Sequence, residues 1–243
     1  MVLVIDAGNS RIKAAVFEQT SLVSQSVITD GDFYEGVKNI LDTFPITDIV
    51  GAFVGKSSVA EIFSFSERVK ISVIDRNFHF PFVNRYATPE TLGIDRMVLV
   101  AGAVLRFPTA NRLIIDAGTC ITYDYVDRED IYYGGAISPG IQLRYKALND
   151  YTANLPSLAA QIPKSITGDS TNESIHSGVV NGAVLEIDGF IDQYRIINPN
   201  IIIILTGGDA VFLANRLKNT IFANSNFLLE SLNQTHQYKL QND

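Results

Sequence analysis

A short stretch that occurs twice constrains this chain more than any other feature. Residues 2–10 and 113–120 are each a run of aliphatic residues followed by Asp-Ala-Gly and a small polar residue. Val and Ile favour extended backbone, so each run predicts a buried strand that ends at the Asp. Asp and Gly are also common at ordinary strand ends. Two copies, led by Asp6 and Asp116 in a chain of 243 residues, indicate a duplicated fold with one phosphate loop in each half.

The composition limits the kinds of partner. The chain is 47% hydrophobic and carries a net charge of -7, so it can bury a core but has no basic excess for nucleic acid. Its single cysteine, Cys120, is expected to be a small core thiol and excludes an internal disulfide, which fits a reducing compartment. No apolar run is long enough to span a bilayer. We expect a cytoplasmic protein without membrane or nucleic-acid partners.

The first half starts with a hairpin. Residues 11–17 predict a second strand antiparallel to the first, followed by a strand over 21–28, a helix over 33–44 and a strand over 49–54. Lys13 is expected either to face the phosphates or to be a solvated strand lysine. Residues 51–57 resemble a Walker A loop, but three residues separate the glycines where that motif needs four. Lys56 is therefore assigned to a strand end and helix cap, with a helix expected over 59–68.

A long loop over residues 78–96 follows, rich in aromatic residues and containing two prolines. Loops of this length inside a compact domain are usually functional. The loop ends at Asp95 and Arg96, directly before a buried helix. Asp95 suits a helix start, whereas Arg96 is unfavourable for the helix dipole and is better suited to a bidentate carboxylate contact.

The second half, 111–243, is expected to repeat the plan of the first, 1–110. Strands are predicted at 121–126, 131–137 and 201–205, with a helix over 138–148 and a long helix over 173–195 capped by Ser170 or Asn172. The glycines of that long helix indicate close packing against another element or subunit. Thr206-Gly207-Gly208-Asp209 suits a flat ligand or a phosphate near the backbone, or a plain tight turn. Residues 233–243 are polar and expected to be partly disordered.

The duplicated loops resemble those of the acetate and sugar kinase, heat-shock chaperone and actin superfamily. Within it, residues 6–10, 93–96, 116–119 and 134–140, in this order, resemble type III pantothenate kinases, and 152–156 and 171–175 also resemble family segments. Cys120 replaces a more frequent alanine, and the chain after Phe212 resembles the family poorly. The resemblance implies an α/β chain with a duplicated ribonuclease H-like (actin-like ATPase) fold: two mixed sheets flanked by helices.

The resemblance also implies an activity, ATP-dependent phosphorylation of pantothenate in coenzyme A biosynthesis, and roles for individual residues. Asp95 would be the general base, and Asp6 would hold Mg²⁺, directly or through water. Asp116 would bind K⁺ or NH₄⁺, although residue type alone favours a second magnesium ligand. The implied ATP contacts are Asp6, Ala7, Gly8, Asn9, Ser10, Arg11, Ile12, Lys13 and Thr119. The implied pantothenate contacts are Tyr86, Gly93, Ile94, Asp95, Arg96 and, from the partner of a homodimer, Thr171.

Other activities are possible for this fold. One alternative is a non-catalytic, regulatory protein like the accessory factors that share the pattern. Another is a chaperone-like or actin-like ATPase, although those chains are much longer. A kinase for another small acid or sugar is a third, since a fold does not set its substrate. The presence of both Asp95 and Arg96 favours the pantothenate kinase over the non-catalytic, regulatory alternative.

Overall fold

The computed structural model describes residues 1–8, 12–53 and 61–242, which form two compact units. The first unit comprises Met1–Val83, Ala87–Arg106 and Asn226–Asp243, and the second comprises Asn84–Tyr86 and Phe107–Ser225. The sequence-based division after residue 110 put the C-terminal segment in the second half, whereas its contacts are within the first unit. The predictions for Asn9, Ser10, Arg11 and Lys56 fall outside the described residues.

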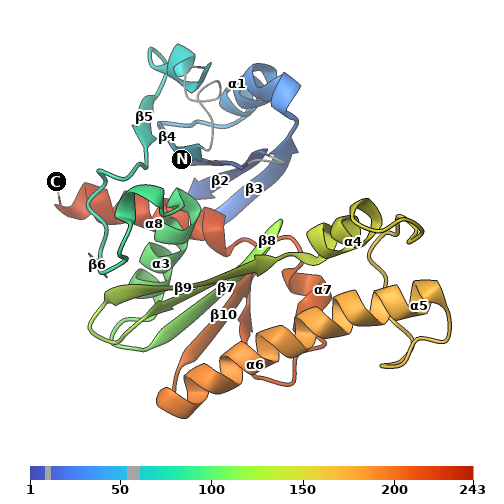
Figure 1. The fold of residues 1–243 in the computed structure, drawn as a ribbon. Coiled ribbons are helices and arrows are strands. Elements are labelled where there is room, and N and C mark those ends of the chain that lie inside the picture. Colours follow the sequence, from blue (N-terminus) through green and yellow to red (C-terminus); the bar gives the residue numbers. More distant parts are fainter. Residues whose placement is uncertain (9–11, 54–60, 243) are drawn as a thin grey trace. The chain divides into compact units, whose positions relative to one another are not determined.

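The first unit contains a mixed five-stranded sheet in the order β3-β2-β1-β4-β5 (Figure 1). Strands β1, β2 and β3 form an antiparallel meander, while β4 and β5 run parallel to β1. The strands are β1 (Val2–Ala7), β2 (Ile12–Glu18), β3 (Ser21–Ile28), β4 (Asp48–Phe53) and β5 (Lys70–Val73). The predicted hairpin is confirmed.

Successive side chains of β1 point to opposite faces of the sheet in the first unit. Leu3 and Ile5 pack in one core with Phe33 and Val37 of α1, so Val4 and Asp6 point to the other face of the sheet. Helix α8 contacts strands β1, β2 and β4, and it also packs against helix α3. The helices are α1 (Phe33–Thr43), α3 (Ile94–Arg106) and α8 (Phe227–Asn242), with 3₁₀ turns at Asp30–Asp32, Phe63–Phe65 and Pro89–Thr91. The described part of the helix expected over 59–68 ends in one of these short turns.

The C-terminal segment is helical up to Asn242, so the expectation of partial disorder was wrong for residues 233–242. It forms α8, in which Leu229, Leu232 and His236 are buried. Their spacing is helical, which the polar composition of the segment obscured. Gly102 of α3 has no side chain where Ser231 of α8 lies, so the two helices cross closely.

The second unit contains a mixed sheet in the order β11-β10-β7-β8-β9-β6. Its antiparallel β7–β8–β9 meander repeats the β1–β2–β3 meander of the first unit, and β10 runs parallel to β7. The strands are β6 (Val83–Asn84), β7 (Arg112–Ala117), β8 (Cys120–Val126), β9 (Ile131–Pro139), β10 (Ile202–Thr206) and β11 (Phe222–Ala223). With two mixed sheets flanked by helices, the predicted fold class is confirmed.

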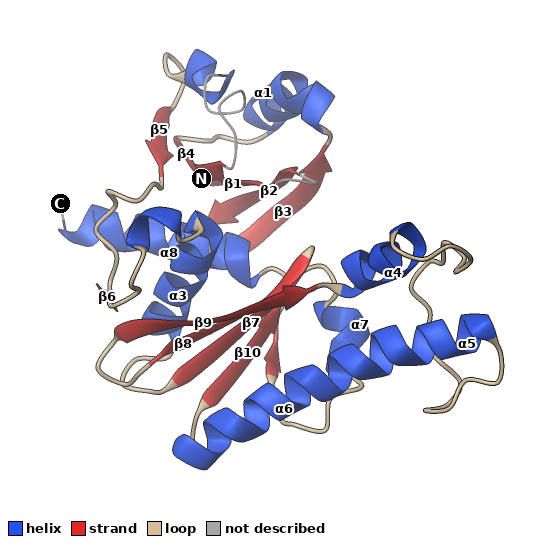
Figure 2. Ribbon diagram, viewed as in Figure 1, coloured by secondary structure: helices blue, strands red, loops and turns tan. Residues whose placement is uncertain are grey.

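Figure 2 shows a long helical run across this sheet. It joins α5 (Thr171–His176), a π-helical segment (Ser177–Asn181) and α6 (Gly182–Ile197), and it packs in one core with α4 (Ile141–Asp150) and α7 (Ala210–Ala214). A methyl group added at any of its glycines would meet no atom of another element within 4 Å, so the expected close packing does not occur within the described chain. Within the described residues, no helix has the length and apolar character needed to cross a membrane.

Candidate functional site

The first loop brings two acidic side chains and one basic side chain together. Asp6 at the end of β1 pairs in register with Lys13 of β2, so both leave the sheet on one face. Asp95, at the start of α3, is close enough to act on Asp6 electrostatically. Burial raises the pKa of Asp6 to about 6; the charge of Lys13 opposes this rise and that of Asp95 adds to it. A partly desolvated carboxylate of this kind is suited to a divalent cation, which would balance its charge.

The other described residues of this loop contribute mainly backbone. Ala7 and Ile12 are buried and pair with each other across the hairpin. Gly8 is exposed. Side chains at these three positions are therefore small, absent or directed into the core, and only backbone groups remain for a ligand.

The helix start at the end of the aromatic loop has the predicted position. Helix α3 begins at Ile94, and Asp95 lies in its first turn, where a negative charge is favourable. The Asp95 Oδ1 atom accepts a hydrogen bond from the Arg96 backbone N–H at 2.8 Å. A side chain at Gly93 would collide with that carboxylate. Arg96 is buried, so its guanidinium is held in place rather than solvated.

The second loop places hydroxyl groups on both sides of its aspartate. Asp116 at the end of β7 pairs in register with Thr122 of β8 and with Thr206 of β10. The Thr122 Oγ1 atom is buried and has no hydrogen-bond partner among the described residues. Hydroxyl, carbonyl and single carboxylate oxygens are the ligands expected of a monovalent cation, whereas Mg²⁺ needs stricter geometry. This donor set fits the K⁺ or NH₄⁺ assignment of Asp116.

Two glycines hold the second loop close to its neighbours. Gly207 has a φ of +98°, and a side chain there would collide with the Ala117 carbonyl and the Asp116 carboxylate. Gly140 donates its N–H to the Thr119 carbonyl at 3.0 Å. Thr119 and Cys120 are both exposed at the loop. The prediction of a core thiol was wrong, because Cys120 lies at the start of β8, where the strand leaves the exposed loop and before its first buried residue, Ile121.

A hydrogen-bonded group around Glu186 of α6 fixes the backbone next to the second loop. Glu186 accepts hydrogen bonds from Tyr123 Oη at 2.8 Å, from Arg144 Nη2 at 2.6 Å and from Ser138 Oγ. Burial raises the pKa of Glu186, but these three donors outweigh it and hold the pKa below its usual range. Since Ser138 and Arg144 flank Gly140, Glu186 helps to fix the backbone that contacts Thr119.

The remaining predicted residues lie on the second unit. Tyr86 follows β6, is half-buried, and stacks on Tyr132. Thr171 is the exposed first residue of α5. Of the two candidate caps, Ser170 is the N-cap, since its side chain accepts a hydrogen bond from the Glu173 N–H at 3.3 Å.

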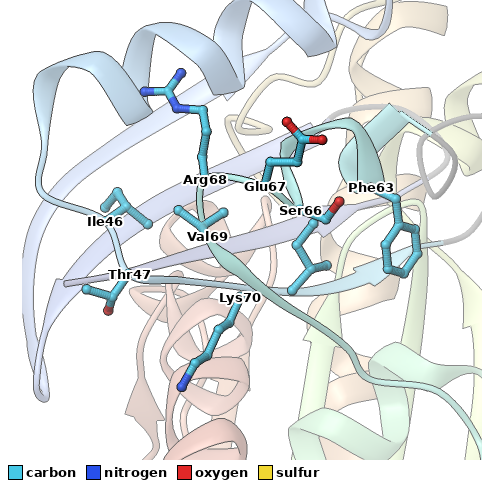
Figure 3. A pocket seen from close by; sticks show the side chains of 9 residues that line it. Ile46, Thr47, Phe63, Ser66, Glu67, Arg68, Val69 and Lys70 are labelled. Atoms are coloured by element: carbon cyan, nitrogen blue, oxygen red, sulfur yellow. The ribbon is translucent and has the colours of Figure 1, made fainter.

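The predicted site residues were compared with possible metal-binding clusters and with a pocket in the first unit. Within residues 1–8, 12–53 and 61–242, no group of three or more His, Cys, Asp or Glu side chains is placed to bind a metal. A pocket of about 660 Å³ lies beside Thr47, Phe63, Arg68 and Lys70 (Figure 3). Thr47 and Lys70 are at the amino ends of β4 and β5, whereas Asp6 is at the carboxyl end of the parallel strand β1. Ligands of α/β sheets bind at carboxyl ends, so this pocket is not the phosphate site.

The family model of type III pantothenate kinases matches residues 2–193 of this chain. The chain belongs to the type III pantothenate kinase family. A type III pantothenate kinase of Flavobacterium johnsoniae is 58% identical over 244 residues, covering 100% of both chains. One of Christiangramia forsetii is 46% identical, covering 96% of each.

Solved structures agree on the fold. A Campylobacter jejuni protein named for the Baf family of transcriptional activators covers 98% of this chain and 99% of its own at 20% identity, with a TM-score of 0.63. A glucokinase from an Antarctic psychrotroph covers 97% of this chain and 98% of its own at 14% identity, with a TM-score of 0.54. At these identities the likeness concerns the fold that this type III pantothenate kinase family member shares with sugar kinases.

Sequence reasoning missed several residues around the two loops. Thr122 could have been found, because a tight hairpin after Asp116 fixes which β8 residue lies opposite it. Thr206 and Glu186 come from distant segments, and nothing local predicts that they approach the loop. Their positions follow from strand order and helix packing alone.

Proposed function

We propose that this family member transfers the terminal phosphoryl group of ATP to the primary hydroxyl of pantothenate, with Asp95 as the general base. The hydroxyl oxygen forms a bond to the γ-phosphorus as the bond to the ADP oxygen breaks, and the hydroxyl proton passes to Asp95. The observation that carries the proposal is the grouping of Asp6, Lys13 and Asp95. Positioning and charge neutralisation supply most of the rate in such transfers, so one well-placed carboxylate suffices as base.

Charged residues on the two loops would hold ATP and its ions. Asp6 would hold Mg²⁺, which when bound neutralises charge on the transferring phosphates. Lys13 and the backbone of residues 7–12 would contact the phosphates, and Thr119 would do so from the second loop. Asp116 would hold K⁺ or NH₄⁺, supported by the hydroxyls of Thr122 and Thr206 in register on either side.

Pantothenate would be bound through its carboxylate and its chain. Arg96, buried at the start of α3, is suited to a bidentate contact with the carboxylate. Gly93 and Ile94 would present backbone beside it, and Tyr86 would contact the substrate through its ring. These assignments explain why an arginine occupies a helix start, where its charge is otherwise unfavourable.

A homodimer completes the proposal. Leu185 is 63% exposed on α6, and the neighbouring helical glycines face no other element of the described chain. A second copy packed along this helix would cover both features and would bring the exposed Thr171 to the partner's substrate. That the enzyme acts in the cytoplasm, without nucleic-acid or membrane partners, stays a prediction.

Release of ADP tests the proposal directly. ATP and Mg²⁺ would be supplied with and without pantothenate, in potassium and in sodium buffer, to the wild type and Asp95→Asn. We expect turnover that requires pantothenate and potassium and that falls by about 100-fold or more in the variant. ATP binding without any pantothenate dependence would contradict the kinase and favour the regulatory alternative.

A further inference from the structure

Tyr86 lies on a flat surface that strand β9 provides. Its ring stacks on the ring of Tyr132, with the centroids 6.2 Å apart and the planes inclined by 21°. The backbone beside it is fixed as well, because the Arg85 N–H donates to the Tyr132 carbonyl at 2.8 Å. The segment that carries Tyr86 is therefore held at both ring and backbone by a single residue of the sheet.

Gly134 supplies the second part of this surface. Its φ is +100°, a conformation that residues with side chains rarely adopt. A methyl group on Gly134 would lie 2.7 Å from Cδ2 and 2.9 Å from Cε2 of Tyr86. Both distances are shorter than van der Waals contact, so the Tyr86 ring can keep its position only if residue 134 has no side chain.

The Tyr132 ring, which forms this surface, is itself held by a buried hydrogen bond. The Tyr132 hydroxyl donates a hydrogen bond to Asp124 Oδ1 at 2.6 Å, and both residues are fully buried. A hydrogen bond to a carboxylate in a buried site is strong and directional. Asp124 therefore orients the Tyr132 ring, and that ring in turn orients Tyr86.

We propose that Gly134 and Tyr132 are positioning residues that fix the Tyr86 ring in the orientation that receives pantothenate. The inference rests on the proposed function, in which Tyr86 contacts the substrate. A ring already held in one rotamer loses little conformational entropy on binding, so the surface strengthens binding of pantothenate. It has no comparable effect on ATP, which is assigned to the two phosphate loops.

A double-mutant cycle tests the collision between residue 134 and the ring. Steady-state kinetics would be measured for Gly134→Ala, for Tyr86→Ala and for the double variant. We expect Gly134→Ala to raise KM for pantothenate by about ten-fold and to leave KM for ATP within about two-fold. In the Tyr86→Ala background, the same substitution should have no further effect, because no ring remains to be displaced.

Several results would overturn the inference. An equal effect of Gly134→Ala with and without the Tyr86 ring would show that backbone strain alone is responsible. An equal rise of KM for both substrates would show a general structural role. If Tyr86→Ala leaves KM for pantothenate unchanged, the substrate role of Tyr86 fails and the inference with it. If Tyr86→Ala raises KM but Gly134→Ala does not, only the inference fails.

A second pair of variants decides the matter if Gly134→Ala does not fold. Tyr132→Phe keeps the ring but removes the hydrogen bond to Asp124. Tyr133→Phe is the matched control, because the next residue of β9 donates a similar bond to Asp127 Oδ2 at 2.9 Å. We expect Tyr132→Phe to raise KM for pantothenate by about three-fold and Tyr133→Phe to change it by less than about 1.5-fold. Equal KM values in the two variants would overturn the inference.

Discussion

The two phosphate loops begin alike and differ in what faces the aspartate. Asp6 and Asp116 each end the first strand of an antiparallel meander. The residue opposite Asp6 is Lys13, whereas the residue opposite Asp116 is Thr122. On the other neighbouring strand, Asp6 is next to Ala52 and Asp116 is next to Thr206. A duplicated backbone has thus been given two different chemical environments.

Under the proposed function, this difference would suit the two copies to different ions. The lysine beside Asp6 would supply positive charge for phosphate oxygens, while burial away from water raises the pKa of Asp6. Two hydroxyls beside Asp116 add oxygen ligands without charge, which suits a monovalent cation. Changing the aspartate should therefore matter more in the first loop, and changing the residues beside Asp116 should alter the ion preference of the second.

The largest effect is expected for Asp6→Asn. Loss of the magnesium-binding charge should lower kcat/KM by about 1,000-fold, the scale found when a preorganised electrostatic group is removed. Purified protein assayed at saturating Mg²⁺ would give this value. Activity within about ten-fold of wild type would show that Asp6 does not hold the magnesium ion.

The same substitution should stabilise the protein. The folded pKa of Asp6, about 6, is above its ordinary value of 3.8, so the wild type loses stability as pH rises from about 4 through about 6. Without Mg²⁺, Asp6→Asn should melt about 3 °C higher than wild type at pH 8, and the two should melt together at pH 4. Thermal unfolding at both pH values measures this, and an equal difference at the two would contradict the assignment.

Replacing Thr122 by lysine would test the cation site of the second loop more sharply than removing the Thr122 hydroxyl. The ammonium group of Thr122→Lys would lie opposite Asp116, where we place the monovalent cation. Activity in sodium buffer should then rise to within about ten-fold of that in potassium, since the side chain replaces the ion's charge. Unchanged dependence on potassium in a folded Thr122→Lys variant would show that the cation does not bind beside residue 122.

Removing one hydroxyl should have a smaller effect on the same site. We expect Thr122→Val, and separately Thr206→Val, to raise the half-saturating potassium concentration by about three-fold to ten-fold, because each removes one oxygen ligand of about 1 kcal/mol. Thr43→Val is the control, since the Thr43 hydroxyl donates to the Asn39 carbonyl within α1, a helix of the first unit. A shift in the control as large as in the two variants would exclude a specific role.

The smallest effect is expected for Glu186→Gln, which weakens the support behind Thr119. KM for ATP should rise by about two-fold, while KM for pantothenate stays constant, since one charged hydrogen-bond group is replaced by a neutral one. Asp192→Asn on the same helix is the control, because its ion pair with Lys218 is exposed. Equal KM values for ATP in both variants would show that Glu186 does not act through the loop.

Much of the fold followed from local patterns. Aliphatic runs ending in Asp-Ala-Gly predicted β1 and β7, and a Pro-rich loop ending in Gly-Ile-Asp-Arg predicted where α3 begins. Two of the errors share one cause. Cys120 was assigned to the core from its residue type, and residues 233–243 were assigned to partial disorder from their polarity. In both cases the position of the side chain in the fold decided burial, and composition does not contain that position.

The sequence by itself determined where the candidate residues lie, because short-range preferences define the strand ends of Asp6 and Asp116 and the helix start of Asp95 and Arg96. Only the tertiary structure decided what surrounds them. Thr206 reaches Asp116 through the pairing of β10 with β7, and Gly134 reaches Tyr86 through the edge of the second sheet. Periodicity specifies which face of a strand is buried, but the identity of the neighbouring strand depends on packing between residues far apart in the chain.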